Sequence, residues 1–303
     1  MRAIIVGGTG FIGRNLVTEL MGNGWEIVVL SRAPGRVAQL FDKGVIGMRS
    51  DNGDWPDMLG PSCVVVNLVG DNIAAGRWTS KKKQRILNSR LEAGDRILRS
   101  IRLAEKAPAA VIQASAIGFY GPQGNDPVDE YSPSGTGFLA DVCRQWEAST
   151  DSLDEMGIRR CIIRTGMVLG RGGALERMLP PFRYFLGGPP GTGEQGVSWI
   201  HMADQVAAIR FLMEHPSARG PFNLTAPTPV NFSSFAETLG KLLHRPAKLK
   251  TPAFALRALF GEMADEILLA GQFALPARLA ELGFTFQYPD LAPALRDVLG
   301  LAE

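Results

Sequence analysis

The stretch Met1-Arg2-Ala3-Ile4-Ile5-Val6-Gly7-Gly8-Thr9-Gly10-Phe11-Ile12-Gly13 decides the fold of this 303-residue chain. A short apolar run that leads directly into closely spaced glycines is typical of a buried parallel strand and the turn into the next helix. Gly7 permits a tight turn, Gly10 lets a pyrophosphate approach the backbone, and Gly13 allows close packing of the helix on the strand. A tight turn without a ligand is the alternative. We predict a Rossmann-type dinucleotide site held by Gly7, Thr9, Gly10, Phe11, Ile12 and Gly13.

Beyond this turn, apolar runs alternate with longer segments of helical periodicity, as in repeated βαβ units. The expected buried strands are residues 3–6, 26–30, 64–68, 110–114 and 161–164, with 45–48 as a weaker candidate. The expected helices between them are residues 14–23, 81–106 and 141–156. In the second of these helices, the residues expected to face the sheet are Leu87, Leu91, Gly94, Leu98 and Ile101. The predicted fold class is α/β, a Rossmann-type doubly wound parallel sheet.

The end of the second strand indicates which dinucleotide fits. Rossmann domains that bind NAD usually carry Asp or Glu there, for the ribose hydroxyl. Here the strand ends in Leu30-Ser31-Arg32, without a carboxylate. Arg32 can form charge-assisted hydrogen bonds with a 2′-phosphate, and Ser31 adds a hydroxyl, so the sequence favours NADP(H). A solvated surface arginine is the alternative.

Two later segments extend the predicted cofactor site. The small residues of Leu68-Val69-Gly70, at the end of the fourth strand, let the backbone pass close to the adenosine half of the cofactor. Asp51, beyond the third strand, is either a contact for the adenine amine or a residue of a loop turn.

The sequence changes character after Thr165, where glycine- and proline-rich stretches imply long loops. We expect an NADP-binding Rossmann domain at residues 1–168, with a later return of the chain near 200–225. Residues 169–303 are expected to form a smaller, loop-rich α/β lobe for the substrate, over the carboxyl ends of the strands. The helices expected in this half are residues 232–243, 253–269 and 291–299.

The composition excludes several other classes. Lys and Arg number 32 against 30 Asp and Glu, so no nucleic-acid-binding surface is expected. Cys63, Cys143 and Cys161 lack metal-ligand spacing and suit a reducing compartment. No secretory signal and no apolar run of membrane-spanning length is present. We expect a soluble cytoplasmic protein without a metal.

The chain also resembles the extended short-chain dehydrogenases/reductases, the family of NAD(P)-dependent sugar-nucleotide epimerases and dehydratases. The motifs that carry this resemblance are Ser115-Ala116-Ile117-Gly118-Phe119-Tyr120-Gly121, Arg164-Thr165-Gly166-Met167-Val168-Leu169-Gly170 and Trp199-Ile200-His201-Met202-Ala203-Asp204. Residues 76–79, 88–90, 138–140, 146–147 and 251–299 are similar to the atypical YfcH-like branch. The resemblance covers nearly the whole chain. It implies that further cofactor contacts come from Leu68, Val69, Arg85, Arg90 and Val168.

The chain departs from the family at the catalytic pair Tyr-x-x-x-Lys, in which the lysine lowers the pKa of the tyrosine. Aligned from Glu147, Leu139 stands in the tyrosine position and Cys143 in the lysine position. A shift by one residue supplies no pair either. The usual catalytic Ser or Thr position falls on Ala116. The standard acid/base pair is therefore absent.

Three residues are candidates for the missing acid/base. Tyr120 could donate a proton, or it could be a packing residue, because a tyrosine with an ordinary pKa is a poor base. Ser115 could hydrogen-bond a substrate carbonyl, or it could only contact the nicotinamide amide of the cofactor. His201 titrates near neutral pH, although such a histidine is more often a structural group that ties two lobes.

The sequence thus predicts an NADP(H)-binding, epimerase-like oxidoreductase of unknown small-molecule substrate. A catalytically inactive NADP(H) sensor or partner-binding protein is the alternative, since the loss of both Tyr and Lys accompanies abandoned or replaced chemistry. A homodimer is possible, because dimers are common among such folds.

Overall fold

The computed structural model describes residues 1–41, 44–50 and 55–301. Its centre is a seven-stranded parallel sheet of order β3-β2-β1-β4-β5-β7-β11. These strands are β1 (Arg2–Val6), β2 (Glu26–Ser31), β3 (Val45–Arg49), β4 (Cys63–Asn67), β5 (Ala110–Ala116), β7 (Arg159–Thr165) and β11 (Gly220–Leu224). The predicted α/β class and doubly wound parallel sheet are confirmed. Asp51 lies outside the described residues.

The direction of winding reverses at β1. The chain proceeds from β1 to β2 and β3 on one side, then crosses back to place β4 on the other. Val6 is in register with Leu30 of β2 and with Asn67 of β4. Ligands of such sheets bind at the carboxyl edge where the winding reverses. The glycine turn after β1 lies at that point.

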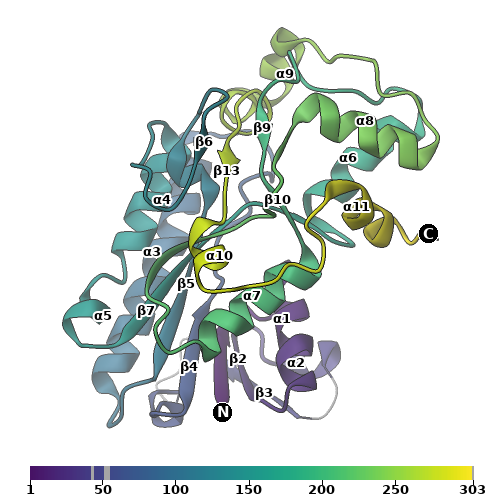
Figure 1. Ribbon diagram of the computed structural model, residues 1–303. Coiled ribbons are helices and arrows are strands. Elements are labelled where there is room, and N and C mark those ends of the chain that lie inside the picture. Colours follow the sequence, from purple (N-terminus) through teal and green to yellow (C-terminus); the bar gives the residue numbers. More distant parts are fainter. Residues whose placement is uncertain (42–43, 51–54, 302–303) are drawn as a thin grey trace.

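Helices cover both faces of the sheet. Leu16, Val17 and Leu20 of α1 (Phe11–Gly22) share an apolar core with Ile209 and Leu212 of α7 (Met202–Glu214). The opposite face packs on Ile97 and Ile101 of α3 (Ser80–Leu103), beside which lies α4 (Phe138–Ala148). Figure 1 shows these layers, with a smaller lobe beyond the carboxyl ends of the strands.

The predicted inward face of α3 was partly wrong. Gly94 and Ile101 are buried as expected, but Leu87, Leu91 and Leu98 are only half-buried. The buried positions on this helix are Lys82, Ile86, Arg90, Ala93, Gly94, Ile97 and Ile101. Arg90 is buried in the place that the apolar pattern assigned to Leu91, and Lys82 is buried one turn before Ile86. The buried face of α3 is therefore shifted by about one residue from the predicted face, because Lys82 and Arg90 form hydrogen bonds with the loop after β4.

Two predicted helices are interrupted. Residues 141–156 form α4 and the separate short helix α5 (Ser152–Glu155). Residues 253–269 form α9 (Ala253–Phe260) and the π-helical η3 (Ala264–Leu268), with Gly261 between them at φ +63°. Helices α8 (Phe232–Leu243) and α11 (Leu291–Leu299) have the predicted bounds.

Residues 202–224 return to the main sheet as α7 and β11, whereas most of the remaining C-terminal residues form the smaller lobe. Its apolar core joins Phe182, Trp199, Phe235 and Leu295. The lobe elements not yet named are β8 (Met167–Leu169), α6 (Gly173–Arg183), β9 (Gly196–Val197), β10 (Trp199–His201), β12 (Val230–Asn231) and β13 (Phe273–Ala274). Helix α10 (Ala277–Glu281) instead packs on β11, and its Leu279 belongs to the apolar core of the main sheet. The remaining elements are α2 (Gly35–Leu40), η1 (Pro56–Met58), η2 (Ile117–Tyr120) and β6 (Pro127–Val128).

Strand β13 pairs in parallel with β6, so the C-terminal segment returns to the carboxyl edge of the main sheet. Among the helices of the described residues, none combines the length and the apolarity needed to cross a bilayer. The same residues contain no group of His, Cys, Asp or Glu arranged to hold a metal ion.

Candidate dinucleotide site

The glycine turn is built so that backbone can approach backbone. Gly7 has φ +89°, a conformation that favours glycine, and a Cβ there would lie 3.1 Å from the Leu68 carbonyl oxygen. A Cβ on Gly13 would lie 2.4 Å from the Gly7 carbonyl oxygen. Helix α1 begins after Gly10, and no side chain caps its first amides. These amides can therefore bind an anion such as a phosphate.

The other residues predicted on this turn border the same edge of the sheet. Thr9 and Ile12 are half-buried. The half-buried ring of Phe11 packs under a glycine-rich loop, where a Cβ on Gly173 would lie 2.8 Å from it. Val168 is buried in β8 beside Ile200 of β10.

At the end of β2, the side chains of Ser31 and Arg32 occupy the position from which Rossmann domains contact the adenosine ribose. The Ser31 hydroxyl accepts a hydrogen bond of 3.1 Å from the Ala33 amide. Arg32 is exposed, so its guanidinium can meet a ligand without displacing core residues.

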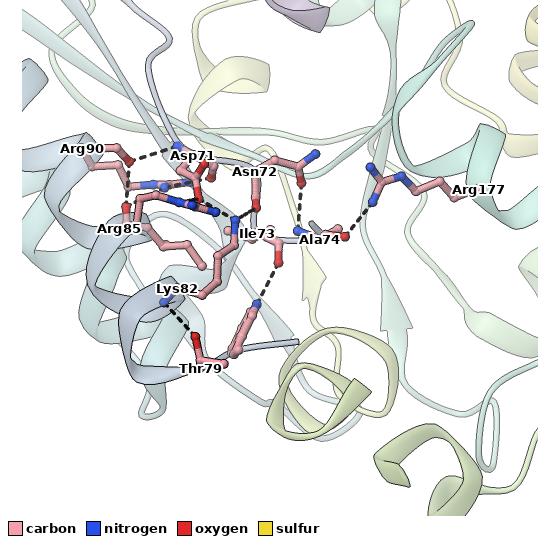
Figure 2. A network of polar contacts seen from close by, with 12 residues as sticks. Asp71, Asn72, Ile73, Ala74, Thr79, Lys82, Arg85, Arg90 and Arg177 are labelled. Atoms are coloured by element: carbon pink, nitrogen blue, oxygen red, sulfur yellow. Dashed lines mark hydrogen bonds and ion pairs between the residues drawn. The ribbon is translucent and has the colours of Figure 1, made fainter. Parts of the chain in front are cut away.

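A polar network fixes the loop after β4 (Figure 2). Lys82 lies 2.5 Å from the Asp71 carboxylate and donates to the Asn72 carbonyl at 2.6 Å, while Arg85 lies 3.1 Å from the same carboxylate. Partial burial acts to raise the pKa of Asp71, but hydrogen bonds from Lys82 and Arg85 outweigh it and lower that pKa. From the other side of the loop, Arg177 of α6 donates to the Ala74 carbonyl at 2.7 Å. Arg85, which the family resemblance places at the cofactor, is thus already paired with a carboxylate.

Ser115 belongs to a buried charged network at the ends of β5 and β7. Its hydroxyl donates to Glu147 at 2.6 Å, and Glu147 forms two hydrogen bonds of 2.9 Å with Arg164. Arg164 also stacks 3.4 Å from the centroid of the Phe119 ring. Burial alone would lower the pKa of Arg164, but the bonds and charge of Glu147 raise it. Because the Ser115 proton is engaged, its oxygen can only accept a further hydrogen bond.

Tyr120 lies at the end of the same network and is fully buried. Its hydroxyl donates to the Asn223 side chain at 2.8 Å and accepts from Arg164 at 3.1 Å. Burial raises the pKa of Tyr120 to about 12, although Arg164 opposes the rise. The structure thus brings Tyr120 and Ser115 together through Glu147 and Arg164, two residues that the sequence did not identify as partners.

His201 lies between the two lobes, as the N-cap of α7. Its Nδ1 accepts from the Ala203 amide at 3.2 Å, which places the ring proton on Nε2, 3.0 Å from Asp297 of α11. Burial lowers the pKa of His201 and Asp297 opposes this. A cavity of about 540 Å³ opens beside the ring toward Asn15 of α1. None of the described contacts of His201 reaches Ser115 or Tyr120.

The sequence profile of the NAD dependent epimerase/dehydratase family matches residues 3–225, which include every strand of the main sheet. The chain belongs to this family. A second profile, for a domain of unknown function (DUF1731), matches residues 251–298. The expected place among the atypical extended short-chain dehydrogenases/reductases is confirmed.

Relatives of this epimerase family match almost the full chain. The SDR39U1 homolog of Arabidopsis thaliana, a chloroplastic epimerase family protein, is 40% identical over 99% of this chain and 87% of its own length. The epimerase family protein YfhF of Bacillus subtilis is 37% identical, over 99% and 98%. The crystal structure of human SDR39U1 (isoform 2) with NADPH is 34% identical, with a TM-score of 0.88 over 99% of both chains.

The family's tyrosine–lysine helix corresponds, in the alignment from the sequence, to α4. Leu139 and Cys143 of α4 both face the segment after β5. A Cβ on Gly118 would lie 3.4 Å from the Leu139 Cβ and 3.8 Å from the Cys143 sulfur. Burial raises the pKa of the Cys143 thiol to about 11, Glu147 adds to the rise, and Arg90 opposes it. In the sequence alignment, an apolar side chain and a buried thiol stand at the two positions.

Glu266 of η3, within the second profile, caps α4. Its two carboxylate oxygens accept from the amides of Phe138 at 2.8 Å and Leu139 at 3.0 Å. Gly137 makes room for this cap, because it has φ +107° and its Cβ would lie 2.6 Å from Glu266. The sequence did not reveal this contact, since nothing in the spacing of residues 137 and 266 links them.

Gly137→Ala should test this cap. The added methyl group strains a positive φ and displaces the carboxylate, so we expect a loss of about 1–3 kcal/mol in the free energy of unfolding, measured with urea. Gly124→Ala is the matched control, because no atom lies within 4 Å of its Cβ. Equal stability of the two variants would contradict the assigned cap.

Proposed function

We propose that this chain is an NADP(H)-dependent oxidoreductase of the epimerase family that acts on a small molecule. The main observation behind this proposal is the glycine turn at the point where the winding of the sheet reverses. The first amides of α1 are uncapped there, and Arg32 is exposed at the end of the neighbouring strand. The human relative crystallised with NADPH supports the choice of cofactor.

The residues present fit this cofactor. The turn is a cradle that side chains would fill, because a Cβ on Gly13 would meet backbone atoms. When bound, NADP(H) supplies the hydride chemistry. The chain would hold the phosphates with the α1 amides, the 2′-phosphate with Arg32 and Ser31, and the nicotinamide end near Ser115 and Val168. We also propose that residues 1–168 with 200–225 carry the cofactor, and that the rest of 169–303 covers the substrate.

For the proton, we propose a restricted role for the three candidates. Ser115 can accept a hydrogen bond, for example from the carboxamide of the cofactor, since its own proton goes to Glu147. Tyr120 positions Arg164 and Asn223 through its enclosed hydroxyl. His201 ties α7 to α11 through Asp297. The proton would then come from substrate or water.

An NADP(H) sensor without turnover is the second candidate, and the engagement of all three groups favours it. Single-turnover oxidation of bound NADPH, followed by absorbance across a panel of carbonyl compounds, separates the two. Saturable, protein-dependent oxidation supports the oxidoreductase. Tight binding of NADPH with no oxidation by any compound of the panel would support the sensor instead.

Arg32→Ala should weaken NADPH binding by roughly 10- to 100-fold, because it removes a charged partner of the 2′-phosphate. Binding of NADH, which lacks that phosphate, should not change. Titration calorimetry measures both. Arg36→Ala removes the same charge from an exposed position four residues later and is the matched control. If Arg32→Ala binds NADPH as tightly as the wild type does, the proposed phosphate contact is wrong.

A further inference from the structure

Three consecutive apolar side chains are exposed where α6 ends. Tyr184 is 75% exposed, and Phe185 and Leu186 are each 59% exposed. Leu249, on the segment after α8, is 55% exposed, and its amide donates to the Gly187 carbonyl at 3.2 Å, which places it next to the end of this run. We call these four side chains the apolar tip. A contiguous group of exposed apolar side chains, unlike a single one, marks a contact surface.

The apolar tip belongs to a rigid turn. Phe185 has φ +63°, a left-handed conformation that is unfavourable for a bulky side chain. Three backbone hydrogen bonds of 2.8–3.1 Å hold the turn, from the amides of residues 184, 185 and 186 to carbonyls of α6. The buried ring of Phe182 packs below it, where a Cβ on Gly187 would lie 2.4 Å from that ring. The fold thus maintains a strained conformation that presents apolar side chains to solvent, which indicates a functional use.

Cations border the apolar tip. The two segments that contain it, residues 183–186 and 241–250, include five Lys and Arg and no carboxylate. Lys241 pairs with Glu237 of α8 at 2.8 Å. The other four have no carboxylate at ion-pair distance among the described residues, and we call them the basic rim: Arg183, Arg245, Lys248 and Lys250. The charge next to the tip is therefore positive and uncompensated within that part of the chain.

Arg245 of the basic rim has unused hydrogen-bond donors beside the tip. Its guanidinium stacks 4.5 Å from the centroid of the Phe185 ring, and Nη1 donates to the His244 carbonyl at 3.0 Å. Nε is buried and has no hydrogen-bond partner in the described part of the chain. A buried donor without a partner is costly. An anionic oxygen bound at this guanidinium would offset that cost, and arginine is well suited to phosphate oxygens.

The rim and the tip together narrow the choice of partner. In a symmetric dimer formed through this surface, the same cations would lie opposite one another and repel. Stacking of nucleic-acid bases needs free aromatic faces, but Arg245 covers one face of Phe185. An acidic protein would need a recess that matches the protruding side chains. The interface of an anionic bilayer accepts aromatic and leucine side chains without such a recess, and its headgroups carry phosphate oxygens.

We propose that the apolar tip and the basic rim form a docking surface for anionic phospholipid membranes. The side chains of the tip enter the interface, while the cations of the rim contact lipid phosphates. Binding by such a surface depends on the buried apolar area together with the attraction to anionic lipids. The contact is peripheral and is made by the smaller lobe (Figure 1). It involves none of the residues proposed to bind NADP(H), so it goes beyond the proposed function and can fail separately.

Co-sedimentation of the full chain with vesicles tests this surface. One vesicle preparation is phosphatidylcholine alone, and the other contains about one third phosphatidylserine, which gives it a negative surface potential. We expect binding to the second to be at least roughly tenfold tighter, because the cations of the rim favour it. This binding should weaken when the salt concentration rises from about 0.1 M to about 1 M, because salt screens the attraction.

The first double variant tests the tip. Phe185→Asn with Leu186→Gln removes apolar area, and asparagine tolerates the left-handed φ of residue 185. It should bind the anionic vesicles at least about tenfold more weakly, because two side chains no longer enter the interface. Phe254→Gln is the matched control, since Phe254 of α9 is 75% exposed and lies outside the tip. This control should bind as the wild type does.

The second double variant tests the rim. Lys248→Gln with Lys250→Gln should bind the anionic vesicles roughly 10- to 30-fold more weakly, because each cation near such a surface adds to the attraction. Lys81→Gln with Lys106→Gln removes the same charge from exposed positions elsewhere and should bind normally. All four variants replace exposed side chains, so their urea midpoints should stay close to that of the wild type.

Two results would overturn the docking surface directly. One is equal binding of the wild type to both vesicle preparations, and the other is binding of the tip variant to anionic vesicles within about twofold of the wild type. Poly-L-glutamate and single-stranded polyuridylate serve as soluble polyanion probes. If the tip variant loses affinity for either of them as strongly as for vesicles, the occupant is an acidic protein or a nucleic acid, and the membrane contact is contradicted.

Discussion

Glu147→Ala should destabilise the protein by about 3–5 kcal/mol, the typical cost of removing one partner from a buried ion pair. The substitution leaves Arg164 charged and 5% exposed, without its two hydrogen bonds to the carboxylate. It also leaves Ser115 without its acceptor. Equilibrium unfolding in urea, followed by circular dichroism, measures the loss.

The double variant Glu147→Leu with Arg164→Met is the control for this interpretation. Replacing both charges by apolar side chains of similar size is often nearly neutral, because no uncompensated charge stays buried. The double variant should therefore be more stable than Glu147→Ala. A single variant that loses less than about 1 kcal/mol would show that the pair is not buried as described.

Gly13→Ala should damage both stability and cofactor binding. A methyl group there would lie 2.4 Å from the Gly7 oxygen and 2.7 Å from the Gly8 Cα, and these backbone atoms cannot rotate away. We expect about 1–3 kcal/mol of destabilisation from overpacking and a more than tenfold weaker binding of NADPH. Urea unfolding and calorimetry provide the two measurements.

Gly22→Ala at the other end of α1 is the matched control. No atom lies within 4 Å of a Cβ at that position, and alanine favours a helix by about 0.5–1 kcal/mol over glycine. This variant should be at least as stable as the wild type and bind NADPH equally well. If both variants behave alike, close packing at the glycine turn is not what limits residue 13.

The parts of the fold that local sequence determines could be predicted well. The apolar runs of β1, β2, β4, β5 and β7 identify buried strands, because parallel strands are covered on both faces. The glycine turn could be predicted for the same reason, because the roles of Gly7, Gly10 and Gly13 depend on residues within one short stretch of chain. Strand β11 was not predicted as a strand, because Gly220 and Pro221 at its start resemble a loop.

The parts that depend on distant partners could not be predicted. The inward face of α3 differs from the apolar pattern because Asp71 and the loop carbonyls hold Lys82 and Arg90 inside. The pairing of Glu147 with Arg164 joins α4 to β7. The cap of α4 by Glu266 joins residues more than a hundred positions apart. Periodicity contains no information about such contacts, so the sequence suggested candidates for the site without their partners.

The C-terminal segment supplies hydrogen-bond acceptors for two buried donors at the end of β11. Asn223 and Thr225, both fully buried, donate to the carbonyls of Leu275 and Ala274 at 2.9 Å. During synthesis, the whole sheet is encoded about 50 residues before these acceptors, a delay of roughly 3–10 s at about 5–20 residues per second. A nascent chain in that interval contains the residues of all seven strands but lacks these two acceptors. We therefore expect Asn223 and Thr225 to become fully buried only after residues 274 and 275 have been synthesised.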